Sequence, residues 1–190
     1  MTHREATAFL DHPAFRNLAT SNPALRTLAT STPTHWADLG CGSGTFTLAL
    51  AEFLAPGSTI DAIDLTPGIH KQTTKTNITI LPQAADIAQP NPTLQNLDGI
   101  LIANALHYIK DQPGFEQLLH STLKPGGTLI IIEYDTDTPV PRWVPYPLSY
   151  ASATRLFAPP HWTSLQKGNT RPSAYGRANL YAAFTTKTTA

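Results

Sequence analysis

The chain has 190 residues, and 13 Lys and Arg balance 13 Asp and Glu, so its formal net charge is zero when histidine is neutral. A chain of this length builds one domain with its own hydrophobic core. The balanced charge, without any basic run, argues against a nucleic acid as the main partner. The single cysteine excludes a disulfide framework and a cysteine-based zinc cluster.

Hydrophobic patterning argues against a membrane protein. The longest apolar runs have the length of a strand, which is too short to cross a bilayer as a helix. The first residues, MTHREATAFLDHP, lack the apolar stretch of a signal peptide. We therefore expect a soluble, cytoplasmic protein without membrane contact. Its oligomeric state, monomer or homodimer, is left open by the sequence.

Residues 1–33 contain two short helical patterns, PAFRNLA and PALRTLA, each with a proline where a helix can start. We expect this segment to form a helical cover that precedes a single domain over residues 34–190. A proline-rich loop is expected within that domain, at residues 135–147, because four prolines there exclude regular helix or central strand.

The segment WADLGCGSGTFTLAL, residues 36–50, reads as a buried strand, a glycine loop and a helix. Asp38 ends the strand, and glycine then occupies every second position, at Gly40, Gly42 and Gly44. Without Cβ atoms, their backbone N–H groups can approach a ligand closely, and the helix N-terminus adds a partial positive charge. The pattern predicts a site for a small ligand with a carboxylate or a phosphate.

The register of these glycines excludes two common nucleotide sites. A dinucleotide fingerprint needs glycine at its sixth position, where this chain has Thr45. A phosphate-binding P-loop needs a Gly-Lys-Ser/Thr sequence, and residues 1–70 contain no lysine.

Strand and helix patterns alternate from the glycine loop to residue 135, which predicts a parallel sheet with helices on both faces. Further strands are expected at 59–65, 77–81, 97–104 and 123–135, and helices at 46–54 and 113–123. Beyond the proline-rich loop, we expect a helix over 148–157 and two closing strands at 161–165 and 178–186.

The spacing Asp38-x-Gly40-x-Gly42-x-Gly44 resembles motif I of the class I S-adenosylmethionine-dependent methyltransferases. The later strands resemble the other motifs of that family in the right order, and the closest likeness is to its small-molecule and quinone-type members. The resemblance implies an α/β fold: a Rossmann-like, doubly wound, mostly parallel seven-stranded sheet with an antiparallel last strand. It also implies that the N-terminal helices cover the cofactor.

The same resemblance implies the residues that bind S-adenosylmethionine. Asp64, at the tip of the second strand, is placed to accept hydrogen bonds from a ribose diol; the alternative role of helix cap suits Thr66 better, since Pro67 follows it. The full implied set is Asp38, Gly40, Cys41, Gly42, Gly44, Asp64, Leu65, Asp86, Ile87, Asn104 and Leu106.

The acceptor side is expected at the carboxyl ends of the fourth and fifth strands. His107 is the candidate general base, because an ordinary histidine titrates near neutral pH; the alternative is a packed histidine. Residues that we expect to contact the acceptor are Tyr108, Glu133, Asp135, Arg142 and Trp143.

No metal site is expected, because the seven histidines are scattered and the acids do not cluster. The Asn/Asp-Pro-Pro-aromatic motif of base-modifying relatives is absent, and Asn104-Ala105-Leu106-His107 stands in its place. This favours a small-molecule acceptor over a DNA base.

The sequence thus predicts an enzyme that transfers a methyl group from S-adenosylmethionine to a small molecule by direct displacement. Three alternatives remain: a non-catalytic cofactor-binding module, a nucleotide-binding oxidoreductase, and a methyltransferase that acts on protein or RNA. The identity of the acceptor, and whether its nucleophile is O, N, C or S, are left open.

Overall fold

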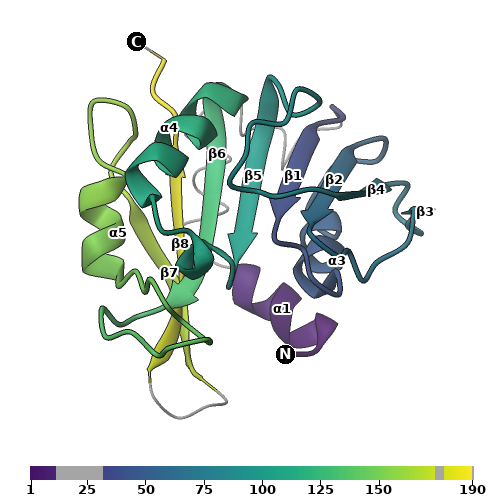
Figure 1. Ribbon diagram of the computed structural model, residues 1–190. Coiled ribbons are helices and arrows are strands. Elements are labelled where there is room, and N and C mark those ends of the chain that lie inside the picture. The colour runs from purple at the N-terminus through teal and green to yellow at the C-terminus, as the bar shows by residue number, and fades with distance from the viewer. Residues whose placement is uncertain (12–31, 174–177, 190) are drawn as a thin grey trace.

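The computed structural model describes residues 1–11, 32–173 and 178–189 (Figure 1). In chain order its elements are α1 (His3–Leu10), β1 (His35–Leu39), α3 (Thr45–Ala51), β2 (Thr59–Asp64), β3 (Gln72–Thr73), β4 (Thr79–Ala84), β5 (Leu97–Ala103), the 3-10 turn η2 (Leu106–Tyr108), α4 (Gln112–Thr122), β6 (Leu123–Tyr134), α5 (Tyr150–Leu156), β7 (Gln166–Pro172) and β8 (Asn179–Thr186).

The strands form one mixed sheet in the order β3-β4-β2-β1-β5-β6-β8-β7. The five from β4 to β6 are parallel, whereas β8 runs antiparallel to β6 and β7 antiparallel to β8. This confirms the doubly wound, mostly parallel sheet. The sheet has eight strands instead of seven because the short β3 pairs antiparallel with the edge strand β4.

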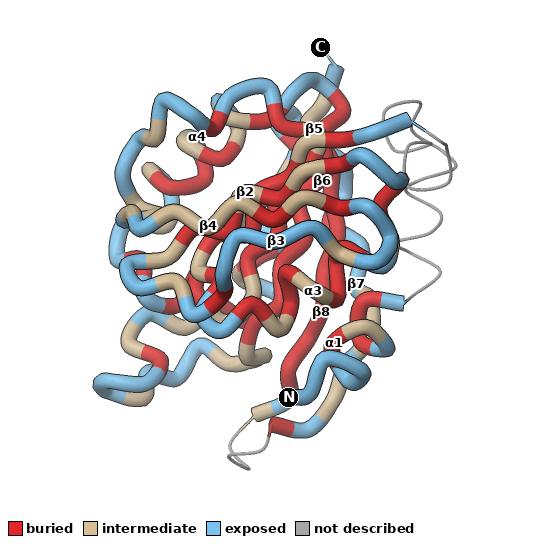
Figure 2. Tube along the Cα trace, turned by 90° about the vertical axis from the view of Figure 1, so that its right-hand side faces the viewer, coloured by how far each residue is buried: buried red, intermediate tan, exposed pale blue. Residues whose placement is uncertain are grey.

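Helices cover both faces of the sheet, as the alternation of elements predicted. Along β5, Ile100 and Ile102 pack on the face that carries α4 and α5, whereas Leu101 packs on the opposite face with α1 and α3. This period of two is the pattern of a strand buried on both sides. Figure 2 shows the resulting band of buried backbone through the middle of the molecule.

Two local expectations differ from the structure. Residues 161–165 form a turn with an isolated bridge at Trp162, and the strand comes later, at β7. No helix follows Thr66; the chain bends there, and the Asp64 carboxylate accepts the Thr66 N–H. The two expected helices at 13–19 and 23–29 lie outside the described residues.

The strand order has its switch point at β1: the chain adds β2 and β4 on one side of β1, and then β5 and β6 on the other side. In open α/β sheets, ligands bind at the carboxyl ends of the strands beside such a switch point. The glycine loop follows β1 and the turn η2 follows β5, so both lie at this edge. The helix α1 lies at the same edge, beside α3 (Figure 1).

Candidate functional site

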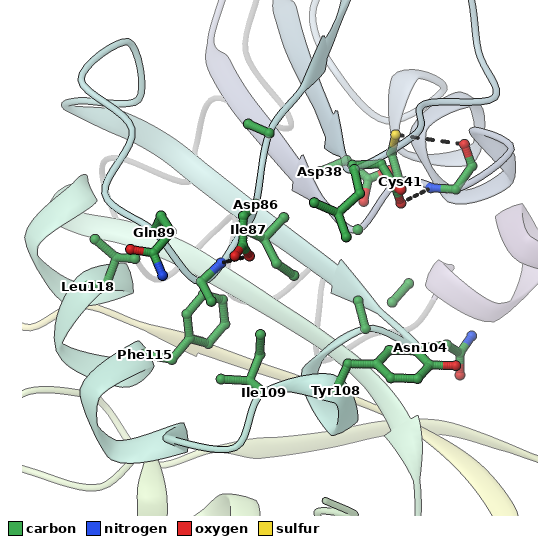
Figure 3. Close-up of a pocket in the computed structure, with 18 of the residues that line it drawn as sticks. Asp38, Cys41, Asp86, Ile87, Gln89, Asn104, Tyr108, Ile109, Phe115 and Leu118 are labelled. Carbon is green, nitrogen blue, oxygen red and sulfur yellow. Dashed lines mark hydrogen bonds between the residues drawn. The ribbon is translucent and has the colours of Figure 1, made fainter. Parts of the chain in front are cut away.

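A cleft of about 1100 Å³ opens at the carboxyl ends of β1, β2, β4 and β5. Figure 3 shows Asp38 and Cys41 at its glycine-loop end and Phe115, Leu118 and Gln89 at the opposite end. Most of the predicted cofactor residues line it, namely Asp38, Gly40, Cys41, Gly42, Asp64, Leu65, Asp86, Ile87 and Asn104.

The three glycines of the loop have different tasks, although all have positive φ angles. A Cβ on Gly40 would lie 2.3 Å from the Cβ of Ala105, so this glycine allows the β1 and β5 ends to approach. A Cβ on Gly42 would meet nothing within 4 Å, because this residue faces the open cleft. Gly44 is the N-cap of α3 and packs against Ile69; it does not line the cleft.

Asp38 is a buried carboxyl group with an incomplete set of partners. The Thr47 hydroxyl donates a hydrogen bond to its Oδ2, whereas its Oδ1 is buried without a partner. Burial raises the pKa of Asp38 to about 7, and the nearby Asp64 carboxylate adds to the rise. Asn104, which has a φ of 55°, likewise has a buried Oδ1 without a partner. Two wall residues thus hold oxygen atoms that can accept hydrogen bonds from a ligand.

Two further acids of the cleft, Asp64 and Asp86, accept hydrogen bonds from backbone N–H groups. The Asp64 carboxylate accepts the Gly42 N–H at 2.9 Å and the Thr66 N–H at 3.0 Å, which fixes the glycine loop against the end of β2. Asp86 is exposed and accepts the Ala88 N–H at 2.9 Å. Both carboxylates keep lone pairs for a ligand, since each oxygen can accept two hydrogen bonds.

Cys41 contributes packing to the wall of the cleft. Its side chain is buried with Ala62, Ile69 and Ile80. Burial raises the pKa of its thiol to about 12, with a further contribution from the Asp38 and Asp64 carboxylates. At neutral pH the thiol is therefore protonated, and the protonated form is a poor nucleophile.

A second cavity, of about 550 Å³, adjoins the cleft. Asn104 and Tyr108 line both spaces and therefore form a shared wall. Two expected acceptor residues, Tyr108 and Trp143, and the expected base His107 line this second cavity. Its other described lining residues are Tyr134, Thr136, Val140, Val144, Ser173 and Ala178.

His107 and Glu133 form a buried pair at this wall. The ring Nδ1 of His107 lies 2.7 Å from Oε2 of Glu133, and the other carboxylate oxygen accepts the backbone N–H of His107 at 3.2 Å. The two residues are 2% and 0% exposed, and Glu133 lies behind the histidine without lining either space. A carboxylate that accepts two hydrogen bonds from one residue holds its ring in one orientation.

Three other predicted residues lie away from both spaces. Leu106 is fully buried in the core. Asp135 accepts the Tyr150 N–H and forms an ion pair with Lys167, so its carboxylate fixes the start of α5. Arg142 is exposed in a turn with a φ of 71° and lines neither space.

Some cleft residues were not predicted from the sequence. The far wall includes Phe115 and Leu118 from α4, and the near end includes Met1 and Phe46. Phe115 and Leu118 are apolar residues of the helix expected at 113–123, but only the fold shows that they line a cleft. Met1 carries no sequence signal of a site.

The structure offers neither a metal centre nor a membrane segment within the ranges it describes. Those ranges contain no group of three or more His, Cys, Asp or Glu side chains with the geometry to hold a metal ion. None of their helices has the length and apolar character needed to span a bilayer.

Comparisons with known proteins agree with this geometry. A family model described as a methyltransferase domain matches residues 10–186. No curated protein matches the sequence.

Solved structures resemble the fold over most of the chain. The Burkholderia thailandensis 1,6-didemethyltoxoflavin-N1-methyltransferase, with bound 1,6-didemethyltoxoflavin and S-adenosylhomocysteine, has a TM-score of 0.66 at 19% identity, over 95% of this chain and 81% of that one. The N-methyltransferase NodS from Bradyrhizobium japonicum WM9, in complex with S-adenosylhomocysteine, has a TM-score of 0.64 at 23% identity, over 93% and 89%. Human N-acetylserotonin methyltransferase, in complex with S-adenosylmethionine, has a TM-score of 0.58 at 19% identity, over 93% and 52%.

The family match spans nearly the whole chain, and the resemblance to the quinone-type branch stays a prediction. The chain therefore belongs to the methyltransferase-domain family and has the fold of S-adenosylmethionine-dependent methyltransferases.

Proposed function

We propose that this protein transfers a methyl group from S-adenosylmethionine to a small-molecule acceptor, and that His107 removes the acceptor's proton. The observation that carries the proposal is the pair of adjoining spaces that share Asn104 and Tyr108. One space has the acids and glycines that suit the cofactor, and the other has a histidine held by a buried carboxylate.

The residues of the cleft fit S-adenosylmethionine. Its methionine end carries an ammonium group, and the unpartnered oxygens of Asp38 and Asn104 are hydrogen-bond acceptors. Its ribose carries two hydroxyl donors, and the Asp64 carboxylate at the β2 tip keeps free lone pairs. Its adenine ring is flat, and Ile87 and Phe115 present apolar surface near Asp86 (Figure 3). We assign the predicted cofactor residues that line the cleft to these roles.

Methyl transfer is a direct displacement, so the chain's main task is to hold the reactants in line. The bound cofactor supplies the methyl group on a sulfonium centre. Positioning of two reactants at contact distance is worth up to about 7–11 kcal/mol in ideal cases. The shared wall of Asn104 and Tyr108 is where the two spaces meet, and we place the transfer there.

The pair of His107 and Glu133 handles the proton. Both carboxylate oxygens of Glu133 already accept backbone N–H groups, so we place the shared proton on Nδ1 of His107, and Nε2 is left as the proton acceptor. Glu133 also offsets the positive charge that the imidazole gains when it takes a proton. Glu133 is thus proposed as a positioning residue instead of the acceptor contact that the sequence suggested.

The solved structures support a small-molecule acceptor. The 1,6-didemethyltoxoflavin-N1-methyltransferase holds 1,6-didemethyltoxoflavin, which is a small molecule, and NodS is described as an N-methyltransferase. We infer that this chain also acts on a small molecule and not on nucleic acid, as a monomer or a homodimer. Its single buried cysteine suits a reducing compartment, which supports the cytoplasm as its location.

Calorimetric titration with S-adenosylmethionine and S-adenosylhomocysteine, and with NADH as control, tests the cofactor. Saturable binding of the first two alone is expected. Binding of NADH would instead favour the oxidoreductase. Binding of the cofactor without turnover on any acceptor of a broad panel would favour the non-catalytic module.

Substitution of the histidine tests the catalytic role. His107→Ala should slow turnover by about 10²–10⁴-fold, the usual contribution of a general base. The Kd for S-adenosylhomocysteine should stay within about twofold of the wild-type value. Glu133→Gln should also slow turnover and shift the pH profile of kcat, because the ring loses its negatively charged partner. Normal turnover in His107→Ala would make the residue a packing histidine.

A further inference from the structure

The second cavity differs from the cofactor cleft in chemical character. The cleft is lined by four aspartates and Lys110. The described lining of the second cavity contains no Asp, Glu, Lys or Arg. Glu133, the carboxylate partner of His107, does not line this space and lies behind the His107 ring.

Four rings from three segments of the chain surround this space. His107 and Tyr108 come from η2, Tyr134 from the end of β6, and Trp143 from the proline-rich loop. The His107 ring lies 4.3 Å from the Tyr108 ring and 5.8 Å from the Tyr134 ring, with interplanar angles of 49° and 57°. Trp143 is 70% exposed, so its indole has little packing of its own and is available to a ligand.

We propose that the acceptor is a neutral, planar aromatic or heteroaromatic molecule that carries a weakly acidic O–H or N–H group on its ring. The proposal rests on the proposed function, because it names the substrate class of that same site. Aromatic side chains bind flat rings by stacked and edge-to-face contacts. The remaining lining is apolar or neutral: Val140, Val144, Ala178, Thr136 and Ser173.

Charge argues against the other classes of acceptor. A carboxylate, phosphate or ammonium group in this cavity would lose water without gaining an opposite charge from any of the described lining residues, which is unfavourable. Arg142, the one cation of the proline-rich loop, lines neither space. The hydrogen-bonding groups of Asn104, Thr136 and Ser173 suit the neutral polar atoms of a heteroaromatic ring.

The base determines how acidic the acceptor must be. Imidazole is a weak base, so it takes a proton more readily from a phenol or an acidic ring N–H than from an aliphatic alcohol. In the transfer, the acceptor's oxygen or nitrogen forms a bond to the methyl carbon, and the proton passes to Nε2 of His107. The carbon–sulfur bond breaks with its electron pair on sulfur, so S-adenosylhomocysteine leaves.

Three compounds with one carbon skeleton test the proposal by calorimetry in the presence of saturating S-adenosylhomocysteine. 2-Naphthol is neutral and flat, naphthalene-2-sulfonate is flat and charged, and decahydro-2-naphthol is neutral and saturated. We expect 2-naphthol to bind about tenfold tighter than either of the others. Equal binding of the sulfonate would overturn the claim that the acceptor is neutral. Equal binding of the saturated alcohol would overturn the claim that the acceptor is aromatic.

Variants locate the binding in the cavity. Trp143→Ala should weaken 2-naphthol binding, and Trp143→Phe should restore most of it. Val140→Lys puts a cation in the lining and should reverse the preference toward the sulfonate, whereas Thr138→Lys, on an exposed residue of the same loop, should not. Unchanged preference in Val140→Lys would overturn the assignment of the cavity.

The same titrations separate this inference from the function on which it rests. Absence of S-adenosylhomocysteine binding would count against the methyltransferase, and the naphthol series would still report on the cavity by quenching of Trp143 fluorescence. Normal S-adenosylhomocysteine binding with no binding of 2-naphthol would overturn the aromatic acceptor and leave the methyltransferase standing.

Discussion

At the scale of single residues, Asp38 and Glu133 are two buried carboxyl groups with different partners. Glu133 accepts hydrogen bonds from the backbone and ring of His107 and from the Tyr134 N–H. Asp38 has one hydroxyl partner, from Thr47, and one oxygen without any. A buried acceptor without a donor lowers stability, so Asp38 makes the ligand-free protein less stable than a fully bonded core would.

Asp38 gives the stability of the protein a pH dependence that can be measured. Its pKa rises from 3.8 to about 7 on folding, so between these values the folded state holds the proton more tightly than the unfolded chain. The free energy of unfolding therefore falls as the pH rises through this window. Asp38→Asn removes this titration. The free energy of unfolding of the variant minus that of wild type should therefore increase by about 2–3 kcal/mol from pH 5 to pH 8.

Urea unfolding of both proteins at the two pH values measures this difference. Subtraction of wild type cancels the carboxyl groups whose pKa is lowered on folding, such as Asp137, since both proteins contain them. A difference that stays constant from pH 5 to pH 8 would show that Asp38 does not titrate in this range. The same variant should bind S-adenosylhomocysteine more weakly, because an amide replaces the carboxylate.

The sequence predicted these residues to different extents. Asp38 and Asp64 end apolar strands, and acids at strand tips are visible in the order of residues alone. The pairing of Glu133 with His107 spans 26 positions and depends on the register of β5 against β6, which places the Asn104 N–H on the Ile132 carbonyl. That register follows from packing of the whole sheet, so the sequence indicated both residues but not their contact.

At the scale of elements, α1 is held at both of its ends. Thr2 and Glu5 form a capping box at its start. At its end, the side chain of Asn169, from β7, donates hydrogen bonds to the carbonyls of Ala8, Phe9 and Asp11. These carbonyls lie at the last turn, where a helix has no internal donors for them.

Removal of this cap should loosen the first eleven residues. Asn169→Ala leaves the carbonyls of the last turn without their donor, which should lower the free energy of unfolding by about 1–2 kcal/mol. Hydrogen exchange in α1 should also become faster, as mass spectrometry of the N-terminal peptide would show. Gln166→Ala, on an exposed residue of the same strand, is the matched control. If exchange in Asn169→Ala is as slow as in this control, the Asn169 side chain does not hold the end of α1.

The elements that the sequence missed have weak patterns. The strand β7 reads Gln-Lys-Gly-Asn-Thr-Arg-Pro, and its residues are exposed or half-buried because it is an edge strand. It has no apolar alternation to detect, and glycine and proline argue against a strand. The buried parallel strands β5 and β6, by contrast, contain the apolar runs Ile-Leu-Ile and Leu-Ile-Ile-Ile, which is why they were predicted close to their observed bounds.

At the scale of the whole molecule, ligand binding should stabilise the fold by mass action. S-adenosylhomocysteine at about 100 times its Kd adds ~2.7 kcal/mol to the free energy of unfolding. For a chain of this size that corresponds to a rise in Tm of about 5–10 °C. Thermal unfolding with and without the ligand measures the shift.

A variant of the cleft provides the control for this shift. Asp64→Ala removes a lining carboxylate and should reduce the rise in Tm, whatever its effect on the Tm of the ligand-free protein. NADH should produce no rise in either protein. A full shift in Asp64→Ala would remove this residue from the cofactor site.

The shared wall of Asn104 and Tyr108 has a consequence for how such an enzyme diversifies. Asp38, Gly42 and Asp64 line only the cleft. From the proline-rich loop, the residues that line only the second cavity are Thr136, Val140, Trp143 and Val144. Under the proposed assignment of the two spaces, mutations in that loop change which acceptor is used while the methyl donor is held as before. The same assignment predicts that single substitutions in the loop give new acceptor preferences and leave the donor site intact, whereas changes at Asn104 or Tyr108, the two described residues that line both spaces, affect both sites at once.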